Sequence, residues 1–61
     1  MKADHIRSIR LNQLLNLALR GAKYDELFDK AMSWGVRKNT AKSYLESVAH
    51  LMRVKGKKIE V

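Results

Sequence analysis

Hydrophobic and polar positions recur with the period of an α-helix in three stretches of this 61-residue chain. In the first stretch, residues 4–20, the apolar side chains cover an arc of about 200°, twice the width that packing on one side requires. They are Ile6, Leu11, Leu14, Leu15, Leu17, Ala18 and Leu19. We expect a helix covered from two sides, either by two other helices or by one helix and a second copy of the chain in a homodimer. Asp4 is the expected N-cap, and Gly21 suits the left-handed position that ends a helix.

The second stretch, residues 24–34, predicts a short amphipathic helix that ends at Gly35. Its apolar positions are spaced by three and four, at Leu27, Phe28, Ala31 and Trp34. The acidic residues fall in the first half, where the helix dipole favours negative charge. They are Asp25, Glu26 and Asp29.

The third stretch, residues 38–51, separates most clearly into two faces. The predicted core face consists of Ala41, Tyr44, Leu45, Val48, Leu51 and Met52. The predicted free face consists of Lys38, Asn39, Lys42, Ser43, Glu46, Ser47 and His50. One side of this helix is therefore expected to pack, and the other to be available to a partner.

Residues 52–61 are compatible with a small β-hairpin around a two-residue turn, Gly56-Lys57. The expected cross-strand pairs are apolar with apolar and basic with acidic: Val54 with Ile59, Met52 with Val61, and Arg53 with Glu60. A helix end followed by a basic tail is the alternative.

Charge points to a polyanionic partner, because thirteen Lys and Arg against six Asp and Glu give the chain a formal charge of +7. Residues 37–61 alone sum to +5. A basic surface that serves only solubility is the plainer interpretation. The chain has no cysteine, no bilayer-spanning apolar stretch and no signal-like apolar block at its start. We expect a cytoplasmic protein of one domain, residues 1–61, with no membrane partner.

The stretch DKAMSWGVRKNTAKSYL resembles the helix-turn-helix pattern of the tri-helical and winged-helix DNA-binding families. The matching positions are Ala31, Trp34, Gly35, Val36, Thr40, Ala41 and Leu45. The chain departs from the pattern at Arg37, where these families usually have a capping Ser or Thr, so Asn39 is an alternative cap that would start the helix later. The resemblance implies a mainly α, three-helix domain with a C-terminal hairpin as its wing, a minimal winged helix.

In this interpretation the chain binds double-stranded DNA, as a small transcriptional regulator or nucleoid-associated protein. Asn39 is the candidate for reading adenine, and Lys38 or Lys42 for reading guanine, with Ser43 beside them. Arg37 and Thr40 are expected at phosphates, and the wing is expected to follow the backbone. The wing lysines are Lys55, Lys57 and Lys58. Arg7, Arg10 and Arg20 are weaker candidates for phosphate contacts.

Other functions have less to rest on. A protein-interaction module that docks through the apolar face of residues 4–20 is the main alternative, and a membrane-surface anchor through the same helix is a weaker one. Tyr24 is the one aromatic residue with enough freedom to stack on an unpaired base. We find no catalytic set, no metal-ligand spacing around His5 or His50, and no motif for a cofactor or small molecule, so we expect no enzyme activity.

Overall fold

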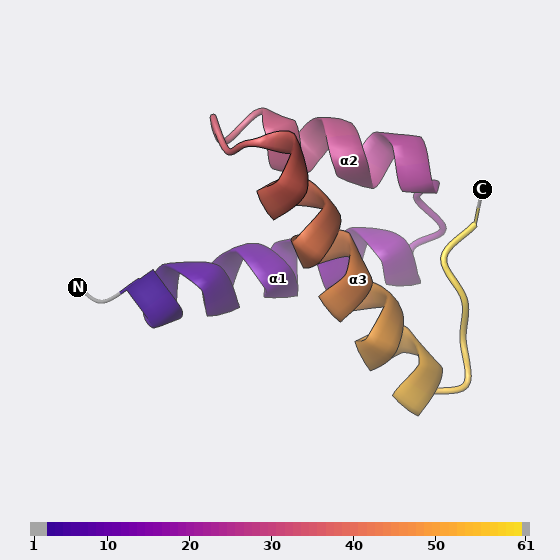
Figure 1. Ribbon diagram of the computed structural model, residues 1–61. Coiled ribbons are helices and arrows are strands. Elements are labelled where there is room, and N and C mark those ends of the chain that lie inside the picture. The colour runs from indigo at the N-terminus through magenta and orange to yellow at the C-terminus, as the bar shows by residue number, and fades with distance from the viewer. Residues whose placement is uncertain (1–2, 61) are drawn as a thin grey trace.

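Three α-helices make up most of the fold in the computed structural model, which describes residues 3–60 (Figure 1). They are α1 (Ala3–Leu19), α2 (Tyr24–Met32) and α3 (Lys38–Val54). Each helix contacts both of the others, and α3 crosses α1 in the view of Figure 1. The mainly helical architecture that the periodicity predicted is confirmed.

A single core lies where the three helices meet. Nine residues are buried there: Leu14, Ala18, Leu27, Ala31, Ala41, Tyr44, Leu45, Val48 and Met52. α1 lies against both α2 and α3, which accounts for much of its wide apolar arc without a second copy of the chain. Ile6 and Leu19 nevertheless stay more than one third exposed, and Ile9, which the predicted arc did not include, is 43% exposed. The prediction that Leu51 belongs to the core face of α3 is wrong, because its side chain is 38% exposed.

The start of α1 differs from the expected cap. α1 includes Ala3, so Asp4 lies inside the helix and is not its N-cap. At the other end, Gly21 has a φ of +99°, and its amide donates to the carbonyl of Ala18, while the amide of Ala22 donates to Leu17. This pair of bonds is the Schellman arrangement, so the predicted helix end at Gly21 is confirmed.

The turn between α2 and α3 is built around Gly35, whose φ of +77° is a conformation that a residue with a side chain rarely adopts. α2 ends at Met32, two residues earlier than predicted, and the Ser33 hydroxyl donates to the Lys30 carbonyl over 2.6 Å. Trp34 and Val36, on either side of the glycine, are half-buried against the core. The turn is therefore anchored on both sides of its reversal.

The predicted β-hairpin is wrong. α3 continues to Val54, so Met52, Arg53 and Val54 are helical, and Met52 extends the buried face of α3 with 2% of its surface exposed. Gly56, at a φ of +75°, ends this helix: its amide donates to Arg53 and the amide of Lys57 donates to Met52. The left-handed glycine that a hairpin turn needs also suits a helix C-terminus, and burial of Met52 on the helix favours the second use. Val61, the predicted partner of Met52, lies outside the described residues.

Residues 57–60 run back along the molecule to the start of α2 (Figure 1). We call them the C-terminal segment. The amide of Tyr24 donates to the Glu60 carbonyl over 2.7 Å, and Lys23 and Glu60 form an isolated parallel bridge, the only β-type pairing within residues 3–60. Ile59 packs against the core from this segment. The segment therefore occupies, as one extended strip, the place where a wing was expected.

A group of basic and aromatic side chains joins α1, α2 and the turn to α3. We call it the cation–aromatic cluster: Arg7, Arg10, Lys30, Trp34 and Tyr44. The rings of Trp34 and Tyr44 meet edge to face with centroids 6.2 Å apart. The guanidinium carbons of Arg7 and Arg10 lie 5.2 Å from the Tyr44 centroid and 5.4 Å from the Trp34 centroid, respectively, and the Lys30 Nζ lies 5.9 Å from the Trp34 centroid. The cluster links α1, α2 and the turn to α3 through Tyr44.

Candidate nucleic-acid interface

The free face of α3 begins at its first residue and stands clear of the core. Lys38, Asn39, Lys42 and Ser43 are exposed, as is Arg37 just before the helix, whereas Thr40 is half-buried beside Ala41. The opposite face holds the buried residues of α3. The predicted separation of this helix into a packed face and a basic free face is therefore present in the structure, with Ser47 half-buried at the border between the two.

The N-terminus of α3 has no side-chain cap. Arg37 is the N-cap residue, in extended conformation, and its side chain makes no capping hydrogen bond to the first backbone amides of the helix. The alternative in which Asn39 caps the helix is wrong, because α3 includes Lys38 and Asn39. The first turn contains no acidic residue. Free amides and neighbouring cations at one helix end form an environment that favours an anion.

Lys55, Lys57 and Lys58 are exposed, but they do not form the tip of a wing. They follow the C-terminus of α3, a helix about 25 Å long that begins at Lys38, and Lys58 lies with Ala49 and Arg53 around one pocket. The predicted DNA contacts therefore form two groups, one at each end of α3. The link that the hairpin was expected to supply between them is absent.

Arg53 belongs with this surface, although the sequence did not single it out. It is exposed and lies eleven residues after Lys42, which places the two on the same side of α3 to within about 20°. The predicted hairpin places this residue in a strand. The spacing of Val48 and Met52, four residues apart, is the signal in the sequence that extends the helix to Arg53.

The arginines of α1 are engaged within the molecule. Arg7 donates to the Ser47 hydroxyl and Arg10 to the Tyr44 hydroxyl, each over 3.2 Å, in addition to their contacts with the rings. They support α3 and are poor candidates for phosphate contacts. Arg20, just after α1, is exposed and lines a shallow hollow of about 450 Å³ with Lys30 and three residues of α1, which are Gln13, Asn16 and Leu17.

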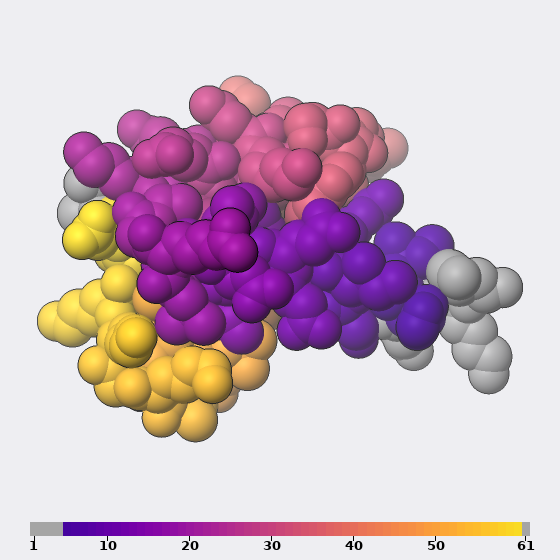
Figure 2. Space-filling model, turned by 180° about the vertical axis from the view of Figure 1, so that it is seen from behind, coloured from indigo at the N-terminus to yellow at the C-terminus, as the bar shows by residue number. Residues whose placement is uncertain are grey.

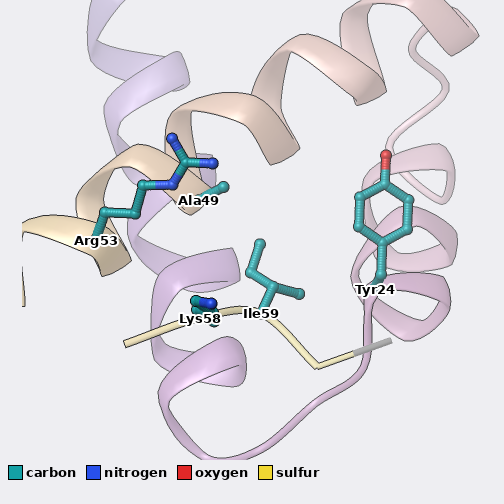
Figure 3. A pocket seen from close by; sticks show the side chains of 5 residues that line it. All are labelled: Tyr24, Ala49, Arg53, Lys58 and Ile59. Carbon is teal, nitrogen blue, oxygen red and sulfur yellow. The ribbon is translucent and has the colours of Figure 1, made fainter. Parts of the chain in front are cut away.

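The aromatic side chains offer little surface for stacking on bases. Tyr44 is buried, and Phe28 and Trp34 are half-buried against the core. Tyr24 is 37% exposed at the start of α2, as the sequence led us to expect. It lies beside the C-terminal segment, at the opposite end of α2 from the turn that leads into α3 (Figures 1 and 3).

Within residues 3–60 no three His, Cys, Asp or Glu side chains gather as metal ligands would, and no helix there is both long and apolar enough to cross a bilayer. Comparisons of the chain with protein-family models, with curated proteins and with solved structures find no match.

Proposed function

We propose that this chain binds double-stranded DNA by placing the first turns of α3 in the major groove, in the manner of a helix-turn-helix domain. The observation that carries the proposal is the exposed face at the start of α3, where Arg37, Lys38, Asn39 and Lys42 face solvent while the other side of the helix is buried. An α-helix fits the width of the major groove, and Asn and Lys side chains can read base edges there.

The backbone of α3 supports the same proposal. Its uncapped first turn leaves amides free for a phosphate, and Arg37 stands beside them. In this arrangement Arg37 and Thr40 hold phosphates and set the position of the helix on the duplex, while Asn39 contacts adenine and Lys38 or Lys42 contacts guanine. Ser43 lies one helical turn after Asn39. A small transcriptional regulator or nucleoid-associated protein is the role we infer.

Replacing Asn39 and Lys42 together by Ala tests the proposal. Both residues are exposed, so the helical circular dichroism should remain unchanged while affinity for a random-sequence duplex falls by roughly tenfold or more. Fluorescence anisotropy with a labelled duplex at constant salt measures the change. Asn12→Ala combined with Lys23→Ala is the matched control, since it removes the same groups from exposed positions outside α3. Equal weakening by both double variants would contradict a groove-reading role for α3.

A second candidate function is supported by the exposed apolar residues of α1. Ile6 and Ile9 are 38% and 43% exposed and lie three residues apart, on one side of α1. A protein partner, or a second copy of the chain, would bury them. Sedimentation of the wild-type chain and of Ile9→Lys, with and without duplex DNA, separates the two functions. A chain that serves only as an interaction module would not bind the duplex, whether it self-associates or stays monomeric. A DNA-binding domain would bind the duplex both as a monomer and as a self-associated form.

A further inference from the structure

We propose that the pocket between the start of α2, the C-terminal half of α3 and the C-terminal segment binds a small aromatic carboxylate. Figure 3 shows the five residues that line it: Tyr24, Ala49, Arg53, Lys58 and Ile59. Its volume is about 310 Å³. This value is at the lower end of the roughly 300–1,000 Å³ typical of small-molecule sites, so the ligand should be small.

The apolar part of the pocket is held in place by the fold. Ile59 packs against the core, and the bond from the Tyr24 amide to the Glu60 carbonyl ties its segment to α2. In Figure 3 the Ile59 side chain lies between the ring of Tyr24 on one side and Arg53 and Ala49 of α3 on the other. Tyr24 is 37% exposed, which leaves part of its ring available for contact. A flat apolar ligand can cover these groups and remove them from water.

The charged part of the pocket comes from two different elements. Arg53 belongs to α3 and Lys58 to the C-terminal segment, and neither forms an ion pair within residues 3–60. A guanidinium can bind a carboxylate through two parallel hydrogen bonds, and the lysine supplies a second positive charge. Two cations that form no ion pair with the described residues, beside an apolar surface, match a monoanion on an aromatic body.

A DNA phosphate fits this pocket less well. A phosphodiester would satisfy Arg53 and Lys58 but would leave Ile59, Ala49 and the Tyr24 ring uncovered. The pocket also lies at the C-terminal end of α3, away from the exposed residues of its first turn. Lys58 is shared with the predicted DNA contacts and Arg53 with the exposed basic side of α3, so the two proposals are tested separately.

Titration of the ¹⁵N-labelled chain with 1-naphthoate, followed by nuclear magnetic resonance, tests the site. We expect saturable shifts of the amide signals of Tyr24, Ala49 and Ile59, with a dissociation constant in the millimolar range or below. The uncharged 1-naphthamide and inorganic phosphate should each bind clearly more weakly than 1-naphthoate. The amide can contact only the apolar part of the pocket, and phosphate only the two cations. Equal response to phosphate would overturn the proposal in favour of a general anion site, and an absence of saturation would overturn it outright.

Single variants identify the cations involved. Arg53→Gln and Lys58→Gln should each weaken naphthoate binding by about fivefold, the size expected for an exposed charge pair. Lys57→Gln removes the same charge from the neighbouring position, which does not line the pocket, and should leave binding unchanged. Equal weakening by Lys57→Gln would overturn the assignment. So would shifts of these same amides by a short duplex DNA but not by naphthoate, which would make the pocket a phosphate contact.

Discussion

At the residue scale, the cation–aromatic cluster explains how basic side chains can stabilise a chain that already carries a charge of +7. Trp34 and Tyr44 present ring faces to three cations, and ring faces attract positive charge. Arg10 contacts both aromatic residues, since it lies over the Trp34 ring and donates to the Tyr44 hydroxyl. This one side chain therefore ties α1 to the turn and to α3.

Removing the two groups of the Arg10–Tyr44 bond, singly and together, tests this link. Tyr44→Phe keeps the ring under Arg7 but loses the hydroxyl, and Arg10→Met keeps most of the apolar stem. We expect Tyr44→Phe to lower the free energy of unfolding by about 1 kcal/mol, which corresponds to a fall in Tm of about 4–8 °C in a domain of this size. Urea unfolding of both single variants and the double variant measures the coupling.

Arg20→Met is the matched control for the arginine, because Arg20 is exposed and has no ring contact. It should change stability by less than about 0.5 kcal/mol. If the effects of Arg10→Met and Tyr44→Phe simply add, the bond between them does not contribute to stability.

At the element scale, the helices were predictable from sequence, and the ends of the chain were less so. Spacings of three and four defined the buried faces of α2 and α3, because each face packs in one direction. The end of α3 was ambiguous, since Met52 satisfies a helical period and a strand pairing equally well. Only the burial of Met52 against the other helices distinguishes a longer helix from a strand. The cap at Asp4 failed because a good capping residue does not oblige a helix to start there.

The candidate interface was predictable to a similar degree. Exposure of Lys38, Asn39 and Lys42 followed from the period of α3, because residues opposite a buried face are solvated. The internal roles of Arg7 and Arg10 could not be predicted, since they depend on how α1 crosses α3. The place of Arg53 on the exposed side of α3 was not predicted, because the helix was expected to end before it.

Ile59 is the residue of the C-terminal segment that packs against the core. Ile59→Ala should free this segment and lower the free energy of unfolding by about 1 kcal/mol, less than for a fully buried isoleucine because the side chain is half-buried. Hydrogen exchange at the Tyr24 amide is the specific measurement, because that amide donates to Glu60. We expect its protection to be lost while amides inside α3 keep theirs.

Lys57→Ala, an exposed change in the same segment, serves as the comparison and should leave the exchange of the Tyr24 amide as it is. If Ile59→Ala also leaves this exchange rate unaltered, the segment is not held by its isoleucine.

At the scale of the whole molecule, most of the positive charge lies in residues 37–61, toward the two ends of α3. The molecule measures 32 × 20 × 17 Å, and Figure 2 shows α1 running across it between α2 and the C-terminal part of the chain. Residues 37–61 carry +5, whereas residues 23–36 sum to −1. Whether both ends of α3 contact one duplex decides how strongly binding depends on salt.

If about five cations from both ends meet phosphates, the logarithm of the binding constant should fall with the logarithm of salt concentration at a slope of about −4 to −5. Contact through the first turn of α3 alone would involve about three cations and give a slope near −3. Anisotropy titrations between low and moderate salt measure the slope. Lys55→Gln with Lys57→Gln should reduce its magnitude by about two in the first case and leave it unchanged in the second. Binding that is insensitive to salt would contradict the DNA proposal itself.

The return of the C-terminal segment to α2 has a practical consequence. The Glu60 carbonyl accepts a hydrogen bond from the first residue of α2, so Glu60 lies at the opposite end of α2 from the turn that leads into α3 (Figure 1). A fluorophore or an affinity tag fused there would sit well away from Lys38 and Asn39. The same geometry would let a following domain be carried on the outside of a protein–DNA complex without obstructing it.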